Sequence, residues 1–76
     1  MKEMIISIKS LHDVYTFINE TQKVDGDVTV KRGRYAVDGK SIMGIFSVDM
    51  SQDVSVTYPE NATNFEEFLK QFKVNR

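Results

Sequence analysis

A chain of 76 residues has room for one hydrophobic core, and we expect residues 1–76 to form a single domain. With no cysteine and one histidine, the sequence excludes disulfides and thiolate metal sites, and we predict neither a metal nor a cofactor. The formal net charge of −1 and the lack of any apolar run near the ~20 residues of a membrane span argue against nucleic acid and membranes as partners.

The N-terminal residues predict a strand followed by a helix. Met4, Ile6 and Ile8 recur at every second position, which is the strand pattern. Ser10 is a good N-cap for the helix, and Asp13 places a negative charge in its first turn. The apolar residues that follow at helical spacing are expected to face the core: Leu11, Val14, Tyr15, Phe17 and Ile18.

A β-hairpin is predicted in the middle of the chain. Val28 and Val30 alternate with polar residues, which indicates a half-buried strand. Arg32-Gly33-Arg34 then makes a tight reversal, and the alternation continues at Tyr35 and Val37 in a paired strand.

The C-terminal half predicts a short helix, a strand and a longer helix. Ser41 is expected to cap a short helix that continues to Val48. Residues 53–58 alternate cleanly and predict the last strand. Asn64 with Glu67 resembles a capping box at the start of the final helix. The expected core-facing stripe of that helix is Phe65, Phe68, Leu69 and Phe72.

The resulting order of elements is β-α-β-β-α-β-α. A hairpin in the middle excludes an all-parallel sheet. We therefore predict an α+β open-faced β-sandwich, with a four-stranded antiparallel sheet and three helices. The two longer helices should cover the apolar face of the sheet, and the short helix should lie beside them.

The stretch VDGKSIMGIFSV, from Val37 to Val48, resembles the regulatory segment of the HPr-like (histidine-containing phosphocarrier) family of the bacterial sugar phosphotransferase system. That family typically has Lys-Ser, two apolar residues, Gly, two more apolar residues, and then Ser with Leu or a similar residue. The matching residues are Lys40, Ser41, Ile42, Met43, Gly44 and Ser47. Since the order of elements agrees as well, the resemblance covers nearly the whole chain and implies the HPr-like fold.

The resemblance also implies where phosphoryl chemistry would occur. In HPr proteins a histidine at the start of the first helix, in a motif like Gly-Leu-His-x-Arg-Pro, accepts a phosphoryl group from the general kinase component and passes it on. Counting back from Ser41 without gaps puts Ser10 at the histidine position and His12 at the arginine position. Asp13 stands where the family has proline. A rival register aligns Leu11-His12 with the family's Leu-His pair, but it needs an insertion before the hairpin.

Each candidate site residue has two interpretations. His12 is either a phosphoryl acceptor or an exposed first-turn residue, so we assign no catalytic residue beyond that alternative. Ser41 is an N-cap, and the resemblance implies that it is also a regulatory phosphorylation site for a serine kinase. Ile42, Met43 and Phe46 either pack in the core or, as the matching residues do in the family, dock partner proteins.

The preferred function is a regulatory or protein-binding module of the phosphoenolpyruvate-dependent sugar phosphotransferase system that has lost the phosphohistidine. Its partners would be proteins of that system or a catabolite regulator, in the cytoplasm. The alternative is an active phosphocarrier that accepts a phosphoryl group on His12. Neither is an enzyme that turns over alone.

Overall fold

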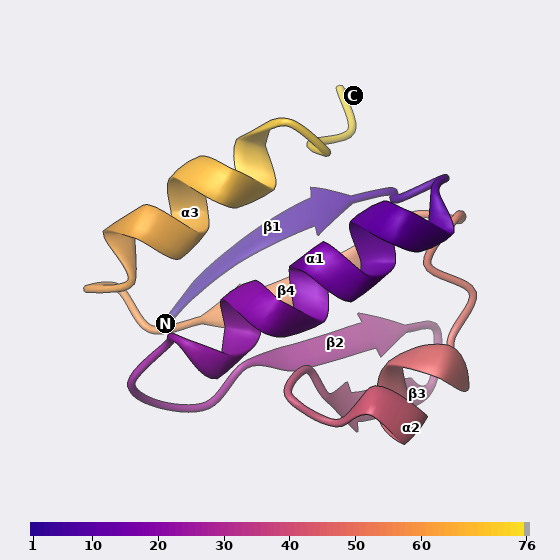
Figure 1. Cartoon of the computed structure of the whole chain (residues 1–76), viewed down its shortest axis with the longest axis horizontal. Coiled ribbons are helices and arrows are strands. Elements are labelled where there is room, and N and C mark those ends of the chain that lie inside the picture. Colours follow the sequence, from indigo (N-terminus) through magenta and orange to yellow (C-terminus); the bar gives the residue numbers. More distant parts are fainter. Residues whose placement is uncertain (76) are drawn as a thin grey trace.

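The chain folds into strands and helices in the predicted order, β-α-β-β-α-β-α (Figure 1). This computed structural model describes residues 1–75. The strands are β1 (Lys2–Ile6), β2 (Thr29–Arg32), β3 (Tyr35–Asp38) and β4 (Val54–Tyr58). The helices are α1 (Leu11–Gln22), α2 (Ile42–Phe46) and α3 (Thr63–Lys70).

The strands form one antiparallel sheet in the order β1-β4-β2-β3. In the central strand β4, Val56 lies opposite Met4 of β1 on one side and Val30 of β2 on the other. The hairpin of β2 and β3 closes through a two-residue turn, in which Gly33 has φ 59°. A positive φ at the first turn position suits a type II′ hairpin, and glycine adopts it without steric cost.

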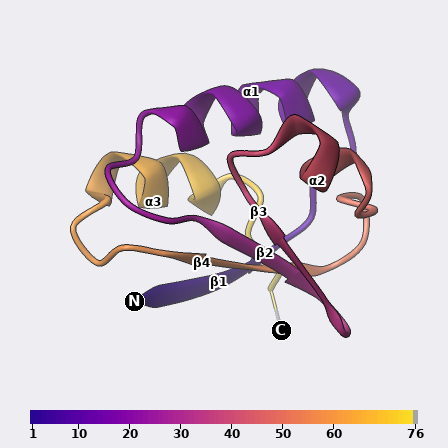
Figure 2. The ribbon, with the colours of Figure 1, turned by 90° about the horizontal axis from the view of Figure 1, so that it is seen from below.

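The helices cover one face of the sheet and leave the other face open (Figure 2). Strand β4 explains this arrangement, because Val54, Val56 and Tyr58 are buried toward the helices while the residues between them are only half-buried. Phe17 of α1 and Phe65 of α3 meet above the sheet with ring centroids 5.9 Å apart. The predicted α+β open-faced β-sandwich is therefore confirmed.

The stripe predicted for α1 is only partly right. The residues that α1 buries are Val14, Phe17, Ile18 and Thr21, which follow the i, i+3, i+4, i+7 pattern. Leu11 and Tyr15 were expected to face the core as well, but 61% and 51% of their surfaces are exposed. They lie one turn apart on the flank of the buried stripe, and a helix that rests on a sheet buries only a narrow face.

Two predicted helix ends are also wrong. Helix α3 begins at Thr63 after Ala62, whose side chain cannot cap it, so Asn64 lies inside the first turn and forms no capping box with Glu67. Helix α2 ends at Phe46 instead of Val48. The chain leaves the helix there because the N–H and hydroxyl groups of Ser47 turn back onto carbonyls of the last turn.

Candidate functional site

Ser10 caps the start of α1, as predicted. Its backbone is extended, with φ −102° and ψ 132°, and its Oγ accepts a hydrogen bond from the N–H of Asp13 at 3.4 Å. His12 is the second residue of α1 and is exposed to solvent. The structure thus places both residues at the N-terminal end of α1, with the Ser10 oxygen used to satisfy the backbone.

The loop after α2 runs alongside this helix start. The backbone carbonyl of Ser51 accepts two hydrogen bonds, from the Lys9 ammonium at 2.6 Å and from the Ser7 hydroxyl at 2.7 Å. Asp49, two residues earlier, accepts hydrogen bonds from the hydroxyl and the N–H of Ser51, which lower the pKa of its carboxyl group. A hollow of about 350 Å³ is lined by residues from this loop and from the start of α1, including Ser10 and Asp49.

This charge distribution is unfavourable for an incoming phosphoryl group. The Lys9 ammonium is bonded to a carbonyl oxygen, and Asp49 contributes a carboxylate to the same hollow as Ser10. A phosphoryl acceptor needs donors and positive charge around it, since the phosphate carries about two negative charges. The site has a helix N-terminus but offsets it with an acidic neighbour.

Ser41 caps the start of α2, as predicted. Its Oγ accepts a hydrogen bond from the N–H of Gly44 at 3.1 Å. Gly44 lies close to the neighbouring strand, because a Cβ at this position would come within 3.3 Å of both Ser41 Oγ and Val37 Cβ. Ile45 is fully buried and anchors the helix in the core. One side of α2 therefore packs in the core, and its other side is exposed to solvent.

The free side of α2 forms an apolar patch with the flank of α1. The members of this apolar patch are Leu11, Tyr15, Ile42, Met43 and Phe46. Met43 is the most exposed of them, at 85%, and the rings of Tyr15 and Phe46 lie 5.4 Å apart. Ile42, Met43 and Phe46 are exposed, as the docking interpretation requires. Leu11 and Tyr15 are exposed as well, although the sequence pattern does not predict them as part of this surface. Contiguous exposed apolar side chains usually mark a binding surface.

Replacing Ser41 with Ala should lower the free energy of unfolding by about 1 kcal/mol, because the first turn of α2 loses its side-chain cap. Ser41→Asp should retain nearly the full stability, since aspartate is an equally good N-cap. Urea denaturation of both variants measures the difference. Equal losses in the two variants would show that the Ser41 hydroxyl has another structural role.

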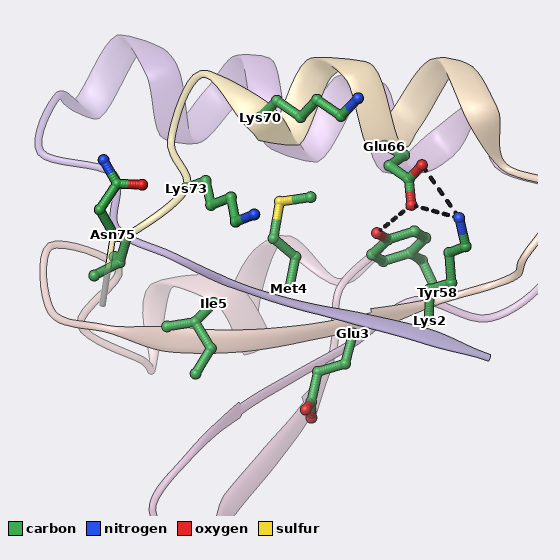
Figure 3. A pocket seen from close by; sticks show the side chains of 10 residues that line it. Lys2, Glu3, Met4, Ile5, Tyr58, Glu66, Lys70, Lys73 and Asn75 are labelled. Atoms are coloured by element: carbon green, nitrogen blue, oxygen red, sulfur yellow. Dashed lines mark hydrogen bonds and ion pairs between the residues drawn. The ribbon is translucent and has the colours of Figure 1, made fainter.

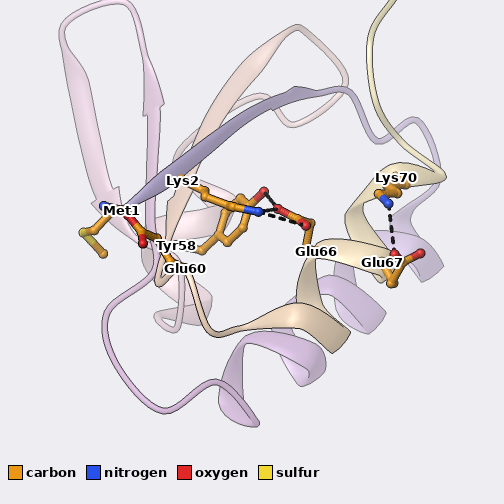
Figure 4. A network of polar contacts seen from close by, with 7 residues as sticks. All are labelled: Met1, Lys2, Tyr58, Glu60, Glu66, Glu67 and Lys70. Atoms are coloured by element: carbon orange, nitrogen blue, oxygen red, sulfur yellow. Dashed lines mark hydrogen bonds and ion pairs between the residues drawn. The ribbon is translucent and has the colours of Figure 1, made fainter.

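A second hollow, of about 790 Å³, lies between β1, α3 and the C-terminal residues (Figure 3). Tyr58 at its edge donates a hydrogen bond from its hydroxyl to Glu66 Oε2 at 2.7 Å, and Lys2 Nζ lies 3.1 Å from the same oxygen (Figure 4). Burial, together with the Glu66 carboxylate, raises the pKa of the Tyr58 hydroxyl to about 12. The three side chains satisfy one another, so this network ties α3 to the sheet and offers no free acid or base.

The Tyr58 hydroxyl should make stability fall at alkaline pH. Its pKa is about 12 in the folded chain against 10.0 for an ordinary tyrosine, so its contribution is complete below pH 10.0 and is lost as the pH rises toward 12. Tyr58→Phe should cost about 1 kcal/mol at pH 7 through the lost hydrogen bond, and should flatten this alkaline fall. Urea denaturation at several pH values, for both proteins, gives the comparison. If the free energy of unfolding of Tyr58→Phe falls as steeply at alkaline pH, the fall belongs to other titrating groups.

Within residues 1–75, no group of three or more His, Cys, Asp or Glu side chains is placed to hold a metal ion. In the same part of the chain, none of the helices combines the length and the apolar character that crossing a membrane requires.

Solved structures with the same fold are known. The chain is similar to HPr-C-His from Thermoanaerobacter tengcongensis, with 26% identity, a TM-score of 0.77 and coverage of 93% of this chain and 89% of that one. The phosphocarrier protein HPr from Bacillus anthracis shares 22% identity, with a TM-score of 0.71 over 95% of this chain and 94% of that one. A histidine-containing phosphocarrier protein from Mycoplasma shares 17% identity, with a TM-score of 0.68 over 92% of this chain and 86% of that one. Comparisons with protein-family models and with curated protein sequences give no match.

Proposed function

Because this chain is an HPr-like protein, we propose that it is a single-domain, cytoplasmic regulatory or protein-binding module of the sugar phosphotransferase system that has lost the phosphohistidine. The observation that carries this proposal is the contrast between the start of α1, where a phosphoryl acceptor would lie, and the apolar patch. Counting back from Ser41 without gaps puts Ser10, an N-cap, at the family's histidine position, whereas the exposed apolar patch lies beside the start of α1.

The start of α1 supports the loss of phosphoryl transfer. The Ser10 hydroxyl is a far weaker nucleophile than an imidazole near neutral pH, and it already accepts a backbone hydrogen bond. Lys9, the nearest cation in sequence, is bonded to the Ser51 carbonyl. Asp49 lines the hollow beside Ser10 and would repel a phosphoryl donor.

The apolar patch supports binding to a protein. Helix α2 has five residues, and it exposes the side chains of Ile42, Met43 and Phe46 to water. Such a helix gains little for folding, since Ile45 is its only buried residue. Methionine and aromatic residues suit an adaptable protein-binding surface. We infer that the partners are proteins of the phosphotransferase system or a catabolite regulator.

Ser41 is where such binding would be regulated. Its Oγ lies at the start of α2, next to Ile42 and Met43 of the patch, and a serine kinase would add about two negative charges there. A helix N-terminus tolerates that charge, so phosphorylation should leave α2 in place and change what the patch binds.

Chemical-shift mapping tests the proposal directly. We expect that titration of the ¹⁵N-labelled protein with the general kinase component of a phosphotransferase system shifts the amides of α2 and of the first turns of α1. The amides around the Tyr58–Glu66 network, which lies between the sheet and α3, serve as the internal control and should not move. Shifts confined to that network, or none at all at millimolar partner, would contradict docking through the patch.

A further inference from the structure

All three hydrogen-bonding groups of Lys40 are engaged, although the residue lies in a surface turn. Its backbone N–H donates to Asp38 Oδ1 at 2.9 Å. Its carbonyl accepts from Gln22 Nε2 at 2.9 Å, and its ammonium donates to the carbonyl of Val24 at 2.7 Å. Gln22 is the last residue of α1 and Val24 follows the C-cap of that helix, so the turn before α2 is bonded twice to a segment 16 to 18 residues away.

The Lys40 ammonium lies at the C-terminal end of α1, where a positive charge is favourable. The last carbonyl groups of a helix carry a partial negative charge, and basic side chains usually neutralise it. Helix α1 has no basic residue in its last turn, and the ammonium of its C-cap residue, Lys23, is bonded to the Glu20 carboxylate. The Lys40 ammonium brings a positive charge from another element to the Val24 carbonyl just beyond this helix end, at a part-buried position where a charge-assisted hydrogen bond is stronger than in water.

The turn before α2 is also packed against Val28, just before β2, so moving it would break contacts of Gly39. Gly39 is buried, and a Cβ there would lie 2.6 Å from Val28 Cγ1. Its N–H donates to the carbonyl of Val28 at 2.7 Å. The turn is thus held on the sheet by Gly39 and on α1 by Lys40, and the next residue, Ser41, is the N-cap of α2.

We infer that Lys40 and Gln22 are positioning residues for the apolar patch, because they fix the start of α2 against the end of α1. Helix α2 has only five residues and is too short to hold its own direction. The Tyr15–Phe46 ring contact joins the two helices at one end of α2, and the Gln22–Lys40–Val24 bonds join them at the other. Together they set how the patch residues of α2 face those of α1. The positioning of α2 does not depend on the proposed function, whereas its effect on binding does.

Hydrogen exchange tests the positioning role without any partner. In Lys40→Met, which retains the aliphatic stem, the exchange rate of the Ile45 and Ser47 amides should increase about tenfold relative to that of Val56 in β4. Gln22→Ala, a change at an exposed position, should give a smaller increase of the same ratio. Lys23→Met is the matched control, because Lys23 lies at the same helix end but its ammonium is bonded to Glu20 of α1 itself. An unchanged ratio in both Lys40→Met and Gln22→Ala would overturn the inference.

Affinity for the general kinase component then links the position of α2 to docking. Lys40→Met should weaken binding by about three- to tenfold and Lys23→Met should leave it unchanged, with Met43→Asp as the variant that removes binding. If exchange becomes faster but affinity stays the same while Met43→Asp abolishes binding, the role in docking is wrong. If Met43→Asp also binds normally, the proposed function itself fails, and the exchange ratio still decides whether Lys40 positions α2.

Discussion

Replacing Met43 with Asp should weaken binding to the general kinase component by at least about 30-fold while leaving the fold intact. The side chain is 85% exposed in the free protein, so a carboxylate there remains in water and should change the free energy of unfolding by no more than about 0.5 kcal/mol. In a complex the same carboxylate would be buried against apolar atoms without a partner, which is costly. The loss therefore belongs to binding alone.

The matched control lies two residues along the same helix. Ile45 is fully buried, so Ile45→Asp should unfold the domain instead of merely reducing affinity, since an unpaired buried charge outweighs the small net stability of a chain this short. Urea denaturation and calorimetric titration of both variants separate the two effects. If Met43→Asp unfolds the protein, or binds as tightly as the wild type, the apolar patch is not a docking surface.

The strands and their pairing could be predicted because their signals are local. Residues 54–58 alternate in burial along β4 as they alternate in polarity, and the Gly33 turn requires the positive φ that the structure shows. The caps Ser10 and Ser41 are local for the same reason, because each bonds an N–H three residues away. A pattern read over a few residues is enough when the interaction itself spans a few residues.

The exposure of Leu11 and Tyr15 could not be predicted from that kind of pattern. Their spacing is helical and their side chains are apolar, which favours the core in the absence of other information. What decides their position is that α2 arrives about 30 residues later and leaves Phe46 beside Tyr15 at the surface. Sequence periodicity describes one helix at a time and does not show which flank another element uses.

The hydrogen bonds of the Lys9 and Lys40 ammonium groups could not be predicted from the sequence either. Both ammonium groups donate to backbone carbonyls, those of Ser51 and Val24, and a carbonyl is present at every residue. No residue type therefore marks the acceptor. Lys9 is the cation nearest to His12 in the sequence, and its ammonium is bonded to the Ser51 carbonyl in the loop that follows α2.

Incubation with phosphoenolpyruvate and the general kinase component should leave this protein without a phosphohistidine. The transfer would require the imidazole of His12 to attack the phosphoryl group carried by the kinase component, with the new phosphate stabilised by nearby N–H groups and cations. The first N–H groups of α1 include that of His12 itself, and the N–H of Asp13 is already capped by the Ser10 hydroxyl. Asp13 in the same turn, and Asp49 in the hollow that Ser10 also lines, both disfavour added negative charge.

Intact-protein mass spectrometry before and after mild acid treatment measures the result, because a phosphoryl group on histidine is acid-labile whereas one on serine survives. The phosphocarrier protein HPr from Bacillus anthracis, which shares the fold, provides the positive control in the same reaction. His12→Ala should behave like the wild type, with no acid-labile gain in either. An acid-labile gain in the wild type that disappears in His12→Ala would contradict the loss of phosphoryl transfer. It would make His12 the acceptor, since a phosphoryl group on a serine such as Ser10 survives mild acid.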